Sequence, residues 1–143
     1  IVYNEKWKIG GRDCGMRLKT PVELVVAADA ESMLIVRLTA AGVLARAGST
    51  LDKMDSLKSA VEEACTCLVN QTNPPERMAL RFSCEDDQLV FGAEGISEST
   101  PAGDMDETEQ EVVRCILESV ADEVCLFVRD GWLKGVELRA ALC

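Results

Sequence analysis

The sequence contains no histidine, and it is poor in positive charge: 15 Lys and Arg residues stand against 25 Asp and Glu, a formal net charge of −10. The absence of histidine excludes His-dependent catalytic triads and His-ligated metal sites. The shortage of bases argues against a nucleic acid partner, because neutralising phosphates requires a basic face. No apolar run approaches the roughly 18 residues of a membrane span, and no charged-then-apolar signal segment opens the chain. We therefore expect neither nucleic acid nor membrane as a partner.

The 143 residues, 48% of them hydrophobic, suit one domain rather than two. Seven are cysteines, an odd number, and four of these lie in strongly apolar stretches, which indicates reduced thiols and a cytoplasmic location. Cys65 and Cys67 fall on a predicted helix, where residues two apart project about 200° apart. We interpret them as packed small side chains and expect no metal site. A thiol redox sensor is disfavoured, because Glu62 and Glu63 would raise a thiol pKa.

Acidic residues are concentrated between Arg81 and Arg114, a segment that contains no Lys or Arg. Ten acids lie there, a number equal to the whole net charge, so the rest of the protein is balanced with fifteen residues of each sign. Taken singly, such residues are typical of a solvated loop. As a group they create a local field that repels anions.

The first half of the chain predicts one strand and two helices. Short β-branched and apolar residues at 21–28 predict the strand, and Asp29 offers an N-cap to a helix over 29–47. A second helix is predicted over 51–70, where apolar residues repeat every three or four positions. The apolar residues of the first helix also follow helical spacing and form a stripe: Leu34, Leu38, Ala41 and Ala45.

The second half predicts two hairpins around a third helix. The first hairpin covers 77–93 and turns at two aspartates. Small, polar and acidic residues at 92–106 predict a loop, which leads into a helix over 106–121. Two strands over 122–142, joined by an Asp-Gly turn, form the second hairpin.

The resulting order β-α-α-β-β-α-β-β predicts an α/β fold. We expect a two-layer sandwich with three helices on one face of a mostly antiparallel sheet and the other face open. Residues 17–143 are expected to form this single domain. We interpret residues 1–16 either as a leader or as an added edge strand, with Met16 as an alternative natural start.

Two stretches of the sequence carry information beyond their hydrophobic periodicity, because they resemble a known family. The stretch over 32–69 resembles the first two helices of the bacterial anti-sigma-factor serine kinases, which belong to the histidine-kinase-like (GHKL) ATPase superfamily. The second helix of that family has an Asp, an Ala-Val pair and then Glu-Ala-x-x-Asn, and Asp55, Ala60-Val61 and Glu63-Ala64 match it here. The stretch over 112–142 resembles the family's last helix and terminal hairpin.

The resemblance implies roles for one face of the second helix. In the family, the Glu orients or activates the nucleophile and the Asn four residues on ligates Mg²⁺; this spacing places both on one helical face. This chain has Glu63 but carries Cys67 in place of the Asn, and a thiol is a poor ligand for a hard cation. Asn70 lies on roughly the same face and is the alternative ligand. Without the resemblance, Glu63 reads as an ordinary exposed helical glutamate.

The family's other nucleotide elements are altered here. Its Asp-x-Gly-x-Gly run, in which the Asp reads adenine and the glycines admit the nucleotide, corresponds to a stretch that has Gly92 and Gly95 but no preceding Asp. Glu94 stands near the position of a permissive glycine. The family's lid corresponds to 94–106, which holds four acids and no cation. Carboxylates that face Mg-ATP disfavour its binding, because the complex is itself negative.

These changes favour a regulatory protein that binds a sigma factor or an antagonist protein, with a degenerate ATP site, no cofactor and a homodimeric state. The expected contact surface is the N-terminal half of the first helix together with the open sheet face. The alternative is an active serine/threonine protein kinase that uses Mg-ATP to phosphorylate its antagonist, with Glu63 as base. A third interpretation is an unrelated scaffold protein whose helix patterns match by chance.

Overall fold

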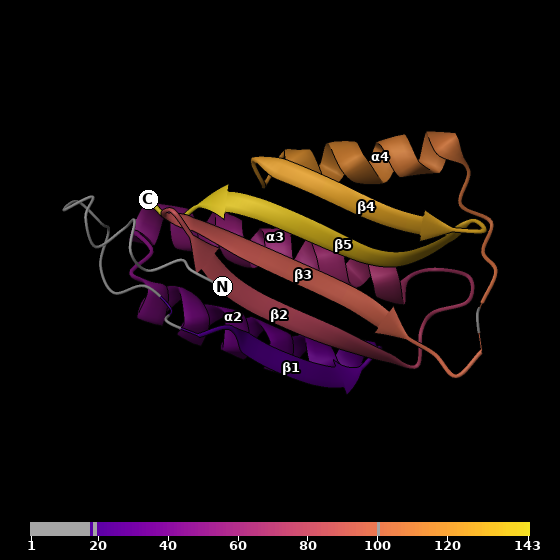
Figure 1. Cartoon of the computed structure of the whole chain (residues 1–143), viewed down its shortest axis with the longest axis horizontal. Helices are drawn as coiled ribbons and strands as arrows, with labels where there is room; N and C mark the ends of the chain where they lie inside the picture. The colour runs from indigo at the N-terminus through magenta and orange to yellow at the C-terminus, as the bar shows by residue number, and fades with distance from the viewer. Residues whose placement is uncertain (1–17, 19, 100) are drawn as a thin grey trace.

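The computed structural model describes residues 18, 20–99 and 101–143, which form a sheet layer and a helix layer (Figure 1). The interpretation of residues 1–16 as a leader or edge strand lies outside the described residues. The elements follow the predicted order, with a short 3-10 turn added before the first α-helix. They are β1 (Val22–Ala27), η1 (Ala30–Ser32), α2 (Met33–Ala47), α3 (Leu51–Val69), β2 (Arg77–Glu85), β3 (Gln88–Ile96), α4 (Glu107–Glu118), β4 (Glu123–Arg129) and β5 (Trp132–Ala141).

The sheet has five strands in the order β1-β2-β3-β5-β4, and every neighbouring pair is antiparallel. Both predicted hairpin turns are present. Asp86 and Asp87 have φ of 48° and 67°, and Asp130 and Gly131 have φ of 52° and 73°. Positive φ at both central residues is the requirement of the tight turns that match strand twist. The turn residues therefore set the register of both hairpins.

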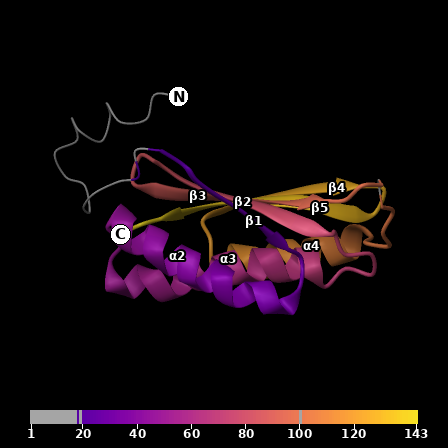
Figure 2. The ribbon, with the colours of Figure 1, turned by 90° about the horizontal axis from the view of Figure 1, so that it is seen from below.

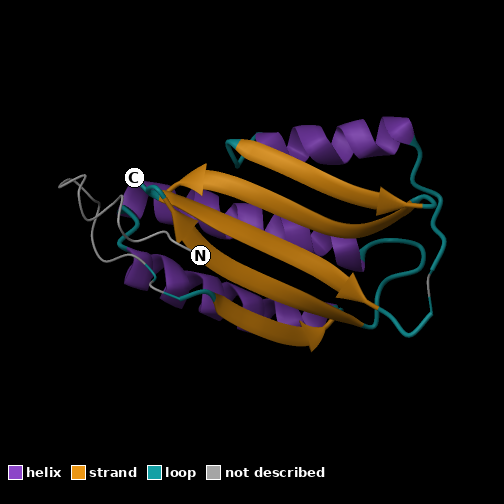
Figure 3. Cartoon of the chain, viewed as in Figure 1, coloured by secondary structure: helices purple, strands orange, loops and turns teal. Residues whose placement is uncertain are grey.

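All three α-helices cover one face of the sheet, and none of the described helices lies on the opposite face (Figures 2 and 3). This arrangement confirms the predicted two-layer sandwich. On β2, alternate residues point into the layer between sheet and helices, where Met78, Leu80 and Phe82 are buried. They share one hydrophobic core with the buried face of α3, which includes Leu57, Leu68 and other apolar residues of the predicted stripe. No helix of the described residues is long and apolar enough to cross a membrane.

The face that α2 buries differs from the apolar stripe identified in its sequence. Leu34 and Leu38 are 58% and 64% exposed, and Ala45 is exposed as well. The residues buried instead are Val36, Ala40, Val43, Leu44 and Ala47. Because α2 is apolar on nearly all sides, two sets of positions have equally good helical spacing. Packing against the sheet and α3 selects one of them.

Two element boundaries also differ from the prediction. Asp29 caps the η1 turn, through a 2.9 Å hydrogen bond from the Ser32 amide, and α2 itself begins only at Met33. Strand β3 continues to Ile96, so the first three residues of the predicted 94–106 lid belong to the sheet. Among the cysteines, the expected reduced state holds for five described residues but is wrong for Cys143, which is disulfide-bonded.

Candidate functional site

A cavity of about 320 Å³ lies between α3, α4 and the segment that precedes α4. Glu63, Cys67 and Asn70 all line it, because their spacing of four and three residues places them on one face of α3. The structure thus brings together the three predicted site residues that lie on or at the end of this helix. The remaining lining residues are Thr66, Gln71, Thr72, Gly103, Asp104, Met105, Glu109, Val113, Ile116 and Gly131.

The two predicted glycines lie elsewhere. Gly92 is in the middle of β3, paired with Arg81 on one side and Glu137 on the other, and it lines a hollow on the open sheet face. Gly95 is buried near the end of β3, where an added Cβ would lie 3.0 Å from the Cβ of Pro75. The composition predicts a loop over 92–106, but residues 92–96 continue the paired strand, so this part of the prediction is wrong. Neither glycine reaches the cavity on α3.

Negative charge dominates the cavity on α3. Glu63 comes from α3, Asp104 from the segment before α4, and Glu109 from the first turn of α4. None of the residues that line the cavity is a Lys or Arg. Carboxylates without cations create a field that repels anions. Among the described residues, no group of three or more His, Cys, Asp or Glu is placed to hold a metal ion.

Both thiols of α3 are kept protonated. Burial raises the pKa of Cys67 to about 11, with a further contribution from the Glu63 carboxylate. Burial likewise raises the pKa of Cys65 to about 12, assisted by Cys67 and Glu62. Because the thiolate is the nucleophile and the metal ligand, neither residue is activated near neutral pH. This argues against the redox-sensor interpretation.

The segment over 101–106 is held in place by hydrogen bonds from two sides. From the α3–β2 loop, Thr72 Oγ1 donates to Asp104 Oδ2 at 3.2 Å, and Asn73 Nδ2 donates to the Ala102 carbonyl at 2.7 Å. From the other side, the amides of Gly103 and Met105 donate to the carbonyls of the Asp130-Gly131 turn at 3.1 and 2.9 Å. In Figure 1 these three segments meet at the right-hand end of the molecule. We call residues 101–106 the strap.

The backbone of the strap comes close to the backbone of the β4–β5 turn where Gly103 meets Gly131. A Cβ at Gly103 would overlap the carbonyl oxygen of Gly131, so the two backbones come together only because residue 103 has no side chain. The α3–β2 loop is fixed in turn. Gln71 exchanges two hydrogen bonds with the Leu133 backbone at 2.7 and 2.9 Å, and Trp132 Nε1 donates to the Asn73 carbonyl at 2.7 Å.

Sequence reasoning missed this fixing of the strap. Thr72 and Asn73 contact residues 32 and 29 positions further along the chain. Hydrophobic period and turn composition carry no signal for such a contact. A run of three amide and hydroxyl side chains directly after a helix, Gln71-Thr72-Asn73, was the available signal.

The fold resembles that of a solved structure. No protein-family model matches the chain. The RsbU and RsbW domains of Rv1364c from Mycobacterium tuberculosis, a solved crystal structure, match with a TM-score of 0.67 and 13% sequence identity; the match covers 87% of this chain and 32% of that one. The fold is therefore that of an RsbW-like, GHKL-type domain.

The sequence is similar to that of several bacterial serine-protein kinases. Serine-protein kinase RsbW of Bacillus subtilis is 38% identical over 71 residues, which are 48% of this chain and 44% of the relative. RsbW of Bacillus velezensis is 42% identical over 72 residues, with the same coverage, and RsbW of Halalkalibacterium halodurans is 36% identical over 77 residues, 52% of this chain and 48% of the relative. The chain is thus a distant homologue of the RsbW anti-sigma-factor serine kinases. The match spans about half the length of these relatives.

Proposed function

We propose that this chain is an RsbW-like regulatory protein that acts by binding a sigma factor or an antagonist protein, and that it does not use ATP. The observation that carries the proposal is the lining of the cavity on α3. Three carboxylates and a protonated thiol face it, and no cation does. A nucleotide triphosphate needs the opposite arrangement, with donors and cations around its phosphates.

The side chains do not fit Mg-ATP. Mg²⁺ requires oxygen ligands in octahedral geometry, and the family position for its amide ligand holds Cys67. Asn70 lies three residues further along, where α3 ends, since its backbone amide is the C-cap donor to Thr66. The carboxylates of Glu63, Asp104 and Glu109 would attract a metal ion but would repel the phosphates of the ATP that is bound to that ion. We derive no catalytic step from this site.

The strap supports the same proposal. In a nucleotide-binding lid, backbone amides must be free to donate to phosphate oxygens. Here the amides of Gly103 and Met105 are already used by the β4–β5 turn, and the Asp104 side chain accepts from Thr72. Opening the strap would leave these groups without their partners. The hydrogen bonds therefore favour a closed segment with a structural role.

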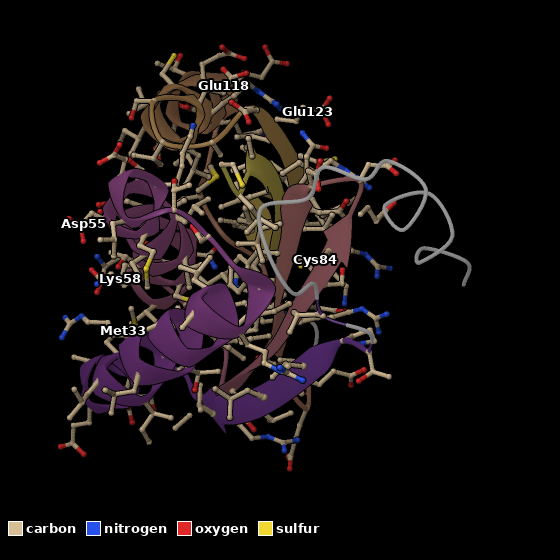
Figure 4. All side chains as sticks on the ribbon, turned by 90° about the vertical axis from the view of Figure 1, so that its left-hand side faces the viewer. Met33, Asp55, Lys58, Cys84, Glu118 and Glu123 are labelled. Atoms are coloured by element: carbon tan, nitrogen blue, oxygen red, sulfur yellow. The ribbon has the colours of Figure 1, made fainter. Side chains whose placement is uncertain are left out.

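The helix layer offers a docking surface. Leu34, Ile35 and Leu38 on the N-terminal half of α2 are 58%, 51% and 64% exposed, and together they form what we call the α2 surface. It borders a groove of about 440 Å³ between α2 and α3, along which Asp55 and Lys58 project outward from α3 (Figure 4). Large apolar side chains gathered on one exposed face are typical of an interaction site. This is the helical half of the contact region predicted from the sequence, and we assign it to a second copy of the chain.

The alternative function, an active serine/threonine kinase, has one observation in its favour: Glu63 and Asn70 line the same cavity. Isothermal titration with Mg-ATP separates the two. We expect no saturable heat from the wild type, and none from Cys67→Asn, because restoring one amide leaves the three carboxylates and the closed strap unchanged.

Micromolar binding of Mg-ATP to the wild type would contradict the proposal and favour the kinase. In that case a phosphotransfer assay with an antagonist protein, compared between wild type and Glu63→Ala, would decide whether Glu63 acts as the base. An unchanged rate in Glu63→Ala would remove the assignment of Glu63 as the base.

A further inference from the structure

A second cavity, of about 210 Å³, opens where β3 ends and meets the β4–β5 hairpin. It shares no lining residue with the cavity on α3. It is therefore a different cavity from the one whose lining argues against ATP. Its lining residues are Glu94, Gly95, Ile96, Ser97, Ser99, Pro101, Arg129, Trp132 and Lys134.

Hydroxyl donors line one side of this cavity. Ser97, Ser99 and Pro101 alternate along the segment after β3 and line the cavity, whereas Glu98 does not line it. Neither serine hydroxyl makes a hydrogen bond with any residue that the structure describes. Two donors are thus available to an occupant of the cavity.

Two basic residues also line the cavity, and the charge of one of them is uncompensated. Lys134 Nζ lies 3.1 Å from Glu94 Oε1, so the lining carboxylate is already paired with the lining ammonium group. Arg129, the last residue of β4, has no carboxylate partner among the described residues. Two other arginines of the sheet, Arg81 and Arg139, are each within 3.4 Å of a carboxylate oxygen. The charge of Arg129 therefore remains for a ligand.

The back of the cavity is rigid. Trp132 is buried, and its indole nitrogen donates to the Asn73 carbonyl at 2.7 Å. Its ring lies against Gly95, where an added Cβ would be 3.2 Å from the ring edge. The ring therefore cannot move into the cavity without breaking this hydrogen bond. Ligand donors mounted on such a platform need little reorganisation.

We infer that this cavity binds a small oxyanion, a carboxylate or a phosphate group. The planar guanidinium of Arg129 matches two oxygens of either group, and the hydroxyls of Ser97 and Ser99 supply further donors. The volume is below the roughly 300 Å³ at which pockets for drug-sized ligands begin. A small anion or one acidic group of a larger ligand fits this size, and a whole nucleotide does not.

Nuclear magnetic resonance titration of the ¹⁵N-labelled chain tests this site. Sodium phosphate and sodium acetate are added in separate arms, with sodium chloride at matched ionic strength as reference. We expect saturable shifts of the amide signals of Gly95, Ser97 and Ser99 and of the Trp132 indole with at least one oxyanion. The arm that saturates at lower concentration identifies the preferred group.

Two variants sharpen the test. Arg129→Gln should weaken binding at least tenfold, while its otherwise unchanged spectrum confirms folding, since Arg129 is exposed. Arg77→Gln is the matched control: Arg77 is also exposed, lies opposite Ile96 on β2, and does not line the cavity. Shifts that stay linear in both arms, or that are equal in wild type and Arg129→Gln, would overturn the inference.

Discussion

Helices α2 and α3 pack side by side on the sheet but divide their apolar residues differently (Figure 2). In α3 the large apolar residues that are buried, such as Leu57 and Leu68, share one face, and Leu51 is exposed at the start of the helix. In α2 they surround the helix, so one set is buried and Leu34, Ile35 and Leu38 remain exposed. The fold needs only the buried set. The exposed set has no structural use within one chain, which is why we assign it to a partner.

The largest expected effect separates the two faces of α2. Leu44→Ala removes a fully buried side chain, and we expect it to lower the free energy of unfolding by about 2–5 kcal/mol. Leu38→Ala removes the same atoms from an exposed position and should change it by less than about 0.5 kcal/mol. Urea denaturation measures the free energy of unfolding of both variants, at protein concentrations too low for self-association. Similar losses in the two variants would contradict the assignment of faces.

The next effect concerns association. Leu38→Asp places a charge in the middle of the α2 surface, and we expect it to raise the dimer dissociation constant at least tenfold, because a buried unpaired charge is unfavourable. Leu51→Asp is the matched control, since Leu51 is 84% exposed but lies at the start of α3, outside the α2 surface. Sedimentation velocity gives both constants. A monomeric wild type, or an unchanged dimer in Leu38→Asp, would argue against this docking surface.

The same contrast explains how much of the fold could be predicted. The buried face of α3 and the turns at Asp86-Asp87 and Asp130-Gly131 follow from local rules: a single apolar stripe and residues that accept positive φ. The face of α2 could not be predicted, because periodicity is uninformative in a helix that is apolar all round. Only its tertiary neighbours distinguish Val36 and Ala40 from Leu34 and Leu38.

The candidate site divides in the same way. Glu63, Cys67 and Asn70 could be placed together because three residues on one helix share a face by spacing alone. The positions of Gly92 and Gly95 could not be predicted. They were expected in a loop, and in this chain regular strand pairing takes the place of that loop. The contacts of the strap could not be predicted from the sequence either, because they join residues about thirty positions apart.

The smallest effect concerns the charges between the two helices. Arg37 on α2 pairs with Glu62 on α3, and their side chains are 54% and 34% exposed. Such a partly solvated pair contributes roughly 0.2–1 kcal/mol. We therefore expect a double-mutant cycle of Arg37→Gln and Glu62→Gln to give a coupling below about 1 kcal/mol, and lower still in high salt because ions screen it.

The ion pair between Asp55 and Lys58 supplies the control for this cycle. It is a 3.6 Å contact within α3 alone, so its cycle measures surface pairing without any link between helices. If the two cycles give similar couplings, charge does little to hold α2 against α3, and the buried residues of α2 account for its attachment. A coupling several times larger for Arg37 and Glu62 would mean that this pair orients α2. Leu34 and Leu38 would then be exposed because an ion pair holds them there, and the case for a partner would weaken.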